Sequence, residues 1–200
     1  MTSLKKPQDM KDVLANLKTV LSTSGTRGST ALEDELTSAT SSNTSLTKSG
    51  SNWNGLNRRP ELGETMLAIA HVIAMRSTCV RRSVGAVLVD HNNRVLSIGH
   101  NGPAKGMPHC TDQPCEGAKC LSGTGLDLCQ AIHAEQNALL FCPDVMKIDK
   151  CFVTTAPCIH CVKMLMNTSC KTIIYAEDYP QASAAKLLWE QDSSRKWFQL

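Results

Sequence analysis

The stretch AIHAEQNA, residues 131–138, is the part of the chain from which the fold can be deduced. A second stretch, APCIHC at residues 156–161, follows after a short interval. The first contains His133, and the second contains Cys158 and Cys161 directly after a proline. Zinc prefers nitrogen and sulfur ligands, and a catalytic zinc has three protein ligands and an open fourth position for water. These three residues are therefore predicted to form a catalytic zinc site.

The spacing of the two cysteines indicates how they are presented. Residues three apart share one face of a helix, and Pro157 suits the first turn, where a missing N–H costs nothing. Free N–H groups and the helix dipole stabilise thiolates at such a helix N-terminus. A second helix that begins at His133 would direct its own N-terminus at the same metal. His160 lies between the two cysteines and is expected to point elsewhere.

Glu135 is predicted to be the general acid and base. Zinc lowers the pKa of a coordinated water towards ~7, and Glu135 would take its proton, pass it to a ring nitrogen and help protonate the departing amine. A lone C-x-x-C can be a core pair or a redox motif, and a lone H-x-E is common by chance. Together they form the H-x-E … P-C-x-x-C signature of zinc-dependent nucleobase deamination.

The surrounding sequence predicts alternating helices and strands. The expected elements are a helix over 61–75, strands over 84–90 and 95–98, a helix over 131–141 beginning at or near His133, a strand over 151–155, a helix over 158–167, a strand over 172–176, a helix over 182–191 and a short strand over 197–200. This order predicts a three-layer α/β/α sandwich with a mixed sheet of about five strands. The first two strands are expected to be antiparallel and the last ones parallel, with right-handed crossovers.

Residues 1–58 differ in composition from the deaminase domain predicted over 59–200. Apolar residues at helical spacing indicate one short helix over 10–21, and the segment 22–51 is more than half Ser and Thr. Such a segment buries too little apolar surface to offset its chain entropy, so a flexible extension is expected. An organelle-targeting role is the alternative, although early acidic residues are untypical of transit peptides.

Bulk composition excludes several classes of protein. No apolar run is long enough to span a membrane, and no secretory h-region is present at the N-terminus. A net charge of +3 gives no reason to expect stable nucleic-acid binding. Ten cysteines without an export signal favour metal ligation and reduced thiols, and hence a cytoplasmic, reducing location.

Four stretches of the chain resemble the deoxycytidylate (dCMP) deaminase family, of the bacterial and phage type, within the cytidine deaminase superfamily. They are RSTCVRRSVGA at 76–86, GHNG at 99–102, IHAEQNA at 132–138, and PCIHC at 157–161 with the downstream Tyr175. The likeness covers residues 62–191. It implies hydrolytic deamination of dCMP to dUMP, which feeds thymidylate synthesis.

The resemblance also implies ligands and partners. Asn101 matches the family residue that contacts the sugar, and the backbone of Ala134 would meet the pyrimidine edge. Members are commonly homo-oligomers, often hexamers, activated by dCTP with Mg²⁺ and inhibited by dTTP. The family usually has Tyr where this chain has His100, a departure that bears on the allosteric response more than on the chemistry.

A second, structural zinc occurs in several phage-type members of the family. Cys79 and Cys110 match ligand positions, and the remaining candidates are Cys115, Cys120 and Cys129. A structural site needs four such ligands, and the sequence leaves open which four. Alternatively, some of these cysteines are free thiols on the long irregular segment over 103–130.

A basic cluster of Arg76, Arg81 and Arg82 precedes the first strand. Guanidinium geometry suits phosphate, so one of these residues, with Arg82 as the candidate, is expected to bind the nucleotide phosphate. The alternative is a solvated basic face.

Other activities are compatible with the zinc motif. A deaminase of a modified cytosine nucleotide stays open, and so does a nucleic-acid-editing enzyme of the tRNA adenosine type. The long Cys-rich segment and the weak net charge disfavour editing. Retention of Glu135 with all three ligands disfavours a non-catalytic scaffold, and Cys79 and Cys110 disfavour a riboflavin-pathway or guanine deaminase.

Overall fold

The computed structural model describes residues 59–121 and 124–200. The predicted N-terminal extension, with its helix over 10–21 and its Ser/Thr-rich segment, lies outside these residues. The elements, in chain order, are α2 (Leu62–Ala74), β1 (Gly85–Val89), β2 (Val95–His100), β3 (Gly102–Pro103), the 3₁₀ helices η1 (Glu116–Lys119) and η2 (Leu126–Leu128), β4 (Ala131–Ile132), α3 (Ala134–Leu140), η3 (Val145–Lys147), β5 (Lys150–Thr155), α4 (Ile159–Met166), β6 (Thr172–Glu177), α5 (Ala182–Trp189) and β7 (Lys196–Gln199).

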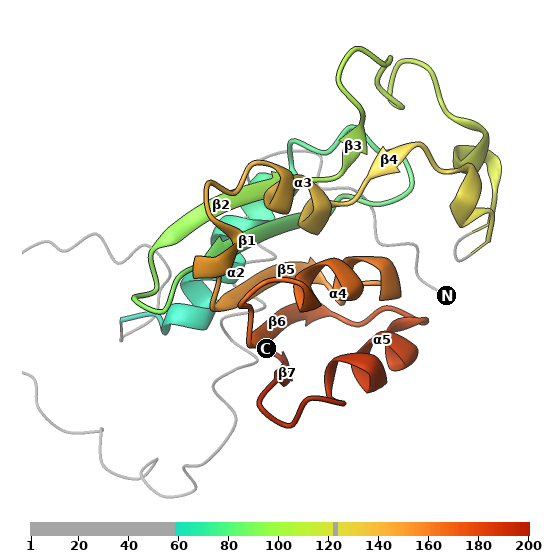
Figure 1. Cartoon of the computed structure of the whole chain (residues 1–200). Helices are drawn as coiled ribbons and strands as arrows, with labels where there is room; N and C mark the ends of the chain where they lie inside the picture. Colours follow the sequence, from blue (N-terminus) through green and yellow to red (C-terminus); the bar gives the residue numbers. More distant parts are fainter. Residues whose placement is uncertain (1–58, 122–123) are drawn as a thin grey trace, which may run out of the picture.

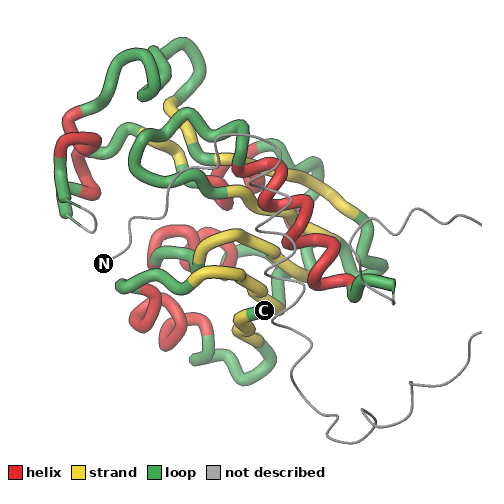
Figure 2. The backbone as a smooth tube through the Cα atoms, turned by 180° about the vertical axis from the view of Figure 1, so that it is seen from behind, coloured by secondary structure: helices red, strands yellow, loops and turns green. Residues whose placement is uncertain are grey.

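The main sheet has five strands in the order β2-β1-β5-β6-β7. Strand β1 is antiparallel to β2 and to β5, whereas β5, β6 and β7 are parallel. Helix α2 covers one face, and α3, α4 and α5 cover the other (Figures 1 and 2). The predicted three-layer α/β/α sandwich with a mixed sheet is therefore confirmed. No helix in the described part of the chain is long and apolar enough to cross a membrane.

The burial of strand β1 on both faces explains why its sequence has no polar residue. All five of its residues are buried. Successive side chains of a strand point to opposite faces. Val87 and Val89 pack against α2 with Leu67, whereas Ala86 and Leu88 belong to the core beneath α3 and α4. A strand covered on both faces needs a continuous apolar run rather than alternation.

Two glycines allow the helices on opposite faces to approach the sheet closely. A β-carbon at Gly85 would lie 2.0 Å from the carbonyl oxygen of Ala70 in α2. A β-carbon at Gly99 in β2 would lie 2.2 Å from the carbonyl oxygen of Ala134 in α3. Only glycine fits such contacts. Gly99 thus places the start of α3 directly against the sheet.

The Cys-rich segment is a loop closed at its base by a small ribbon. Strands β3 and β4 pair antiparallel, with Gly102 opposite Ile132 and Pro103 opposite Ala131. Figure 1 shows the loop between them projecting beyond the end of the main sheet. The predicted start of the helix at or near His133 is confirmed, because α3 begins at Ala134, but Ala131 and Ile132, which the predicted range 131–141 includes, form β4. Two-residue strands carry no periodicity from which they could be recognised.

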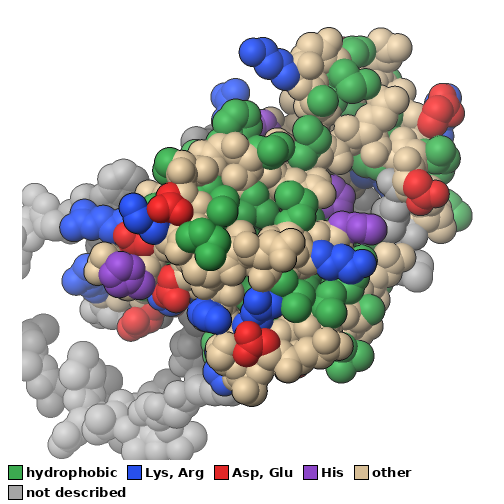
Figure 3. All heavy atoms as spheres, in the orientation of Figure 1, with side chains coloured by type: hydrophobic (Ala, Val, Ile, Leu, Met, Phe, Trp, Pro, Cys, Tyr) green, Lys and Arg blue, Asp and Glu red, His purple; other side chains and the backbone are tan. Residues whose placement is uncertain are grey.

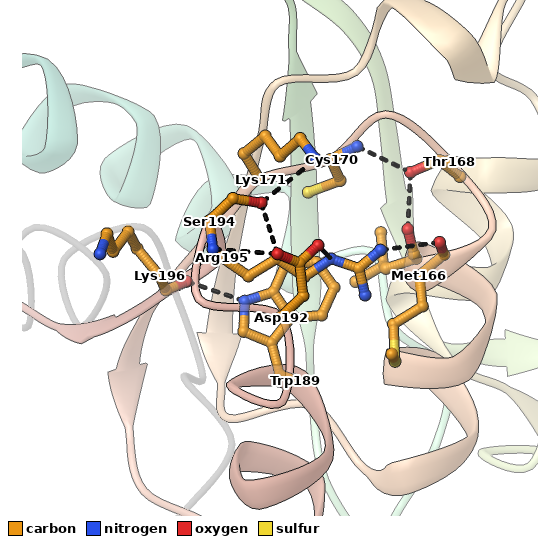
Figure 4. A network of polar contacts seen from close by, with 10 residues as sticks. Met166, Thr168, Cys170, Lys171, Trp189, Asp192, Ser194, Arg195 and Lys196 are labelled. Atoms are coloured by element: carbon orange, nitrogen blue, oxygen red, sulfur yellow. Dashed lines mark hydrogen bonds and ion pairs between the residues drawn. The ribbon is translucent and has the colours of Figure 1, made fainter.

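The C-terminal elements are joined through Trp189, which is fully buried in α5 (Figure 4). Its indole Nε1 donates to the carbonyl oxygen of Lys196 at 2.9 Å. The Arg195 guanidinium lies 4.7 Å from the Trp189 ring centroid and donates to the carbonyl oxygen of Met166 at 2.9 Å. Asp192 lies 3.5 Å from Arg195 Nε. This network attaches β7 and α5 to the end of α4.

Trp189→Ala is expected to lower the free energy of unfolding by about 3–5 kcal/mol, because it leaves a cavity in a close-packed core. Trp189→Phe keeps most of the apolar volume and is the matched control, with a smaller loss that includes the indole hydrogen bond. Urea unfolding followed by circular dichroism measures both losses. Equal losses for the two variants would contradict the proposed packing role.

Candidate active site and metal centre

The three predicted ligand atoms converge in space. His133 Nδ1 lies 3.4 Å from Cys158 Sγ and 3.4 Å from Cys161 Sγ, and the two sulfurs are 3.7 Å apart. Tetrahedral zinc, with bonds of about 2.3 Å to sulfur and about 2.0–2.1 Å to nitrogen, separates two sulfurs by about 3.8 Å and sulfur from nitrogen by about 3.6 Å. Among the described residues, no other three His, Cys, Asp or Glu side chains come together this closely. The donor set fits zinc.

Two helix N-termini present these ligands. His133 is the N-cap of α3, Cys158 is the N-cap of α4, and Cys161 follows in the first turn of α4. The hydrogen bond with Cys161, together with His133, lowers the pKa of the Cys158 thiol to about 3. The same bond and burial raise the pKa of Cys161. The site therefore holds negative charge on sulfur, as a cation site requires.

Glu135 lies beside the cluster without belonging to it. It occupies the first turn of α3, is 3% exposed and lines the adjoining cavity. Burial raises the pKa of its carboxyl, and the charge of His133 partly opposes this rise. A carboxyl group whose pKa is raised towards the working pH can both accept and release a proton.

The cluster opens into a cavity of about 660 Å³. Figure 3 shows histidine side chains bordering a hollow below the projecting loop. The cavity is lined by residues from the segment before β1, the start of α3, the ends of β5 and β6, and the Cys-rich loop, namely Cys79, Arg81, Arg82, Val84, Asn101, Asp127, Cys129, Ala131, His133, Ala134, Glu135, Thr155, Ala156, Cys158, Ile159, His160, Tyr179, Gln181 and Ala184. The predicted substrate-binding residues Asn101, Ala134 and Arg82 are all among them.

Asn101 braces the cavity wall. Its Oδ1 accepts from the backbone N–H of Val84 at 2.8 Å, and its Nδ2 donates to the carbonyl oxygen of Arg82 at 2.8 Å. The side chain thus holds the backbone that carries Arg82. Its contact with the sugar of a substrate stays a prediction.

The basic cluster divides into three different environments. Arg82 lines the cavity, and its buried Nη1 has no hydrogen-bond partner among the described residues. Arg81 also lines the cavity, but its guanidinium is bound to the Cys-rich loop, donating to the carbonyl oxygens of Leu121, Thr124 and Gly125 at 3.2, 2.9 and 3.5 Å. Arg76 is exposed and does not line the cavity. Of the three arginines, Arg82 is the one that lines the cavity with no hydrogen bond from its guanidinium to another described residue.

The side chain of His100, the residue that departs from the family pattern, does not line the cavity. Its carbonyl oxygen accepts a hydrogen bond from Asn137 Nδ2 at 2.7 Å, which ties the end of β2 to α3. Burial and the charge of Arg76 lower the pKa of its imidazole. Only the backbone of His100 takes part in this contact with α3. Histidine in place of the family's tyrosine therefore leaves the metal cluster undisturbed.

Sequence reasoning missed the part of the cavity wall that follows β6. Tyr179 and Gln181 lie there. A signal for them existed, because the carboxyl ends of parallel strands meet at one edge of a sheet, and Cys158 follows the neighbouring strand β5. Tyr175, which contributes to the family resemblance, is a core residue whose ring lies 5.5 Å from that of Trp197. His160 lines the cavity but lies outside the ligand group, as expected.

A second set of cysteines surrounds a smaller cavity at the base of the loop. Its cysteines are Cys79, Cys110, Cys115 and Cys129, and Cys79 and Cys129 also line the larger cavity. The sulfurs of Cys110 and Cys115 are 3.8 Å apart. Backbone N–H groups, first that of Gln130, lower the pKa of Cys115. The fifth candidate, Cys120, does not line this cavity.

Comparison with known proteins agrees with this geometry. Residues 60–177 match the model of the cytidine and deoxycytidylate deaminase zinc-binding region. ComE operon protein 2 of Bacillus subtilis is 40% identical over 129 residues, which are 62% of this chain and only 64% of that protein. The deoxycytidylate deaminase of Mycobacterium phage D29 is 34% identical over 126 residues, 60% of this chain and 98% of the phage protein.

A solved structure shows the same likeness. The dCMP deaminase of cyanophage S-TIM5, crystallised with dCMP and dUMP, superposes with a TM-score of 0.56 and 27% identity, covering 72% of this chain and 99% of the phage chain. The match to the family model includes His133, Cys158 and Cys161, whose atoms have the separations that zinc requires. The chain therefore belongs to the cytidine and deoxycytidylate deaminase family.

Proposed function

We propose that this protein catalyses the hydrolytic deamination of dCMP to dUMP and so supplies dUMP for thymidylate synthesis. The observation that carries the proposal is the position of Glu135, buried beside a His/Cys/Cys cluster at the wall of a nucleotide-sized cavity. The similarity to the D29 deoxycytidylate deaminase and to the S-TIM5 dCMP deaminase supports this substrate.

In the proposed mechanism, His133, Cys158 and Cys161 hold zinc, which when bound activates water as a nucleophile at neutral pH. Glu135 removes a proton from the attacking water and delivers it to N3 of the cytosine ring. The water oxygen bonds to C4, and the C4–N4 bond then breaks. Glu135 takes the remaining proton from the C4 hydroxyl and gives it to the departing amino group, so that ammonia leaves and the uracil carbonyl forms. The raised pKa of Glu135 suits a group that must carry protons in both directions.

Substrate positioning is assigned to the rest of the wall. Arg82 binds the 5′-phosphate, because its buried Nη1 needs a partner and guanidinium geometry matches phosphate oxygens. A single guanidinium at the cavity wall suits a nucleotide that carries one phosphate group. The backbone of Ala134 meets the pyrimidine edge, and Asn101 contacts the sugar while bracing Arg82.

The proposal is tested by ammonia release from dCMP, 5-methyl-dCMP, dCTP, deoxycytidine and a tRNA that contains adenosine at the wobble position. We expect dCMP to have the highest kcat/KM. A preference for 5-methyl-dCMP would favour the alternative of a modified cytosine nucleotide. Activity on tRNA alone would replace the proposal with nucleic-acid editing.

We further propose a structural zinc held by Cys79, Cys110, Cys115 and Cys129. A closed tetrahedral site takes four thiolates, and the 3.8 Å separation of the Cys110 and Cys115 sulfurs equals the sulfur–sulfur distance of about 3.8 Å in such a site, whereas no three of these four sulfurs all lie within 4.8 Å of one another. The backbone of Gln130 directs an N–H at Cys115, which stabilises its thiolate. Cys120 lies instead with its sulfur 3.8 Å from the carbonyl oxygen of Glu116. The proposal therefore leaves Cys120 out of the ligand set.

Metal analysis of the purified protein is expected to give two zinc ions per chain, one for each cluster. Cys110→Ser removes a ligand of the structural site, so one zinc per chain should remain. Cys120→Ser, a matched change on the same loop, should leave both. One zinc in the unmodified protein, or the same loss in the two variants, would refute the assignment.

Assembly and regulation are proposed on the resemblance. We expect a homo-oligomer, and the resemblance implies a hexamer. Association is supported by exposed apolar side chains, each at least 64% exposed, namely Leu140, Phe141, Met146 and Leu187. Figure 3 shows hydrophobic side chains gathered on the face that carries α3 and α4. Activation by dCTP with Mg²⁺, inhibition by dTTP and a cytoplasmic location stay predictions. Light scattering with and without these nucleotides measures the oligomer.

A further inference from the structure

Tyr179 and Arg82 meet across the substrate cavity although they come from distant parts of the chain. The Arg82 guanidinium carbon lies 5.5 Å from the centroid of the Tyr179 ring. Arg82 precedes β1, Tyr179 follows β6, and both line the cavity. A guanidinium within about 6 Å of an aromatic face is attracted by the ring quadrupole. This contact therefore restricts where the Arg82 side chain can go.

Within residues 59–121 and 124–200, no hydrogen bond or ion pair restrains the end of the Arg82 side chain. Asn101 holds only the Arg82 backbone, through its carbonyl oxygen. The nearby carboxylate of Glu177 forms no ion pair with Arg82 within 4.0 Å in the described part of the chain. The charge of Arg82 nevertheless lowers the pKa of Glu177, against the larger effect of burial, so the two groups face the same region. The Tyr179 ring thus places the Arg82 guanidinium, whose buried Nη1 has no hydrogen-bond partner among the described residues.

We propose that Tyr179 is a positioning residue that holds the Arg82 guanidinium towards the cavity, ready for the phosphate of the nucleotide. The proposal rests on the proposed function, because it needs a phosphorylated substrate. An arginine side chain loses considerable rotamer freedom when it binds a ligand. Stacking on Tyr179 removes most of that freedom beforehand, which strengthens phosphate binding without touching the reacting atoms.

The ring, rather than the hydroxyl, carries this role. Tyr179 Oη donates to Gln181 Oε1 at 3.5 Å, a contact within the same connection between β6 and α5. Tyr179→Phe keeps the aromatic face and is the matched control. Tyr179→Leu keeps apolar bulk but removes the quadrupole.

The test is steady-state kinetics on dCMP with the full-length, zinc-loaded protein. Tyr179→Leu is expected to raise the KM for dCMP roughly tenfold while kcat stays near that of the unmodified enzyme. Tyr179→Phe should restore the KM. Deoxycytidine, assayed at high enzyme concentration, lacks the phosphate, so its kcat/KM should be the same for all three proteins. An unchanged kcat at saturating dCMP also shows that the variants are folded.

A double-mutant cycle separates positioning of Arg82 from a direct contact with substrate. In an Arg82→Ala background, Tyr179→Leu should have little further effect on the KM, because the residue it positions is absent. Additive effects of the two changes, or an equal loss on dCMP and deoxycytidine, would overturn the proposal. The proposal is also overturned if the unmodified enzyme deaminates dCMP and the Tyr179→Leu variant is equally active at low dCMP concentration. Failure of the unmodified enzyme to deaminate dCMP would refute the proposed function instead.

Discussion

Glu135→Gln will retain its zinc and lose turnover on dCMP by a factor of about 10²–10⁴, the usual contribution of a general acid–base group. Glutamine has nearly the same shape as glutamate, but it cannot take the proton from water or return it to the leaving amine. The side chain is buried beside the ligand cluster without belonging to it, so the change leaves His133, Cys158 and Cys161 in place. Zinc content and kcat, measured on the same preparation, test both halves of the expectation.

Asp127→Asn is the control for Glu135→Gln. Asp127 is a second carboxylate on the cavity wall, but it is exposed and lies on η2 of the Cys-rich loop. The Asp127→Asn variant should retain most of the turnover, because Asp127 takes no part in the proposed proton transfer. If Glu135→Gln keeps more than a small fraction of the turnover, or if both variants lose it equally, Glu135 has no role as the proton carrier.

Cys158→Ala will lose the catalytic zinc and, with it, activity down to background. The change leaves His133 and Cys161 as the remaining ligands, and two protein ligands are too few for the three-ligand site of a catalytic zinc. It also removes the thiolate that the N-terminus of α4 and the contact with Cys161 stabilise. Zinc per chain should fall by one ion.

Cys142→Ala is the matched control for Cys158→Ala. Cys142 is half-buried and lines neither of the two cavities that the Cys clusters border. Its replacement should change neither zinc content nor kcat. The same zinc content in Cys158→Ala and Cys142→Ala would show that the His/Cys/Cys cluster does not bind the metal. Combining Cys158→Ala with Cys110→Ser should remove both zinc ions, because each change affects a different site.

Much of the fold was predictable because its signals are local. The apolar run at Gly85–Val89 indicated a strand covered on both faces, and helical spacing indicated α2. The pairing of β1 with β5, by contrast, has no local signal, because their contact joins residues far apart in the chain. The short ribbon of β3 and β4 was missed for a related reason, since two residues show no period.

The catalytic cluster was predictable because few residues, at short spacings, define it. His133 and Glu135 share one turn, and Cys158 and Cys161 share another, so each pair is placed by its own helix N-terminus. Only the distances of 3.4 and 3.7 Å between the ligand atoms required tertiary structure.

The substrate wall depended on the tertiary structure. Arg81 and Arg82 are neighbours in the sequence, yet Arg81 donates to loop carbonyl oxygens, whereas the buried Nη1 of Arg82 has no hydrogen-bond partner among the described residues. Their different surroundings come from the Cys-rich loop and from Tyr179, which approach from distant parts of the chain.

The sequence by itself determined the three-layer fold, the His/Cys/Cys cluster and the glutamate proposed to carry protons, because helix and strand periods and helix N-termini are local properties of the chain. Tertiary structure decided which four of five cysteines surround one cavity, and that the Arg82 guanidinium lies against the Tyr179 ring at the wall of the other. These residues lie on irregular segments without a period, so their positions follow only from how the loops pack against one another.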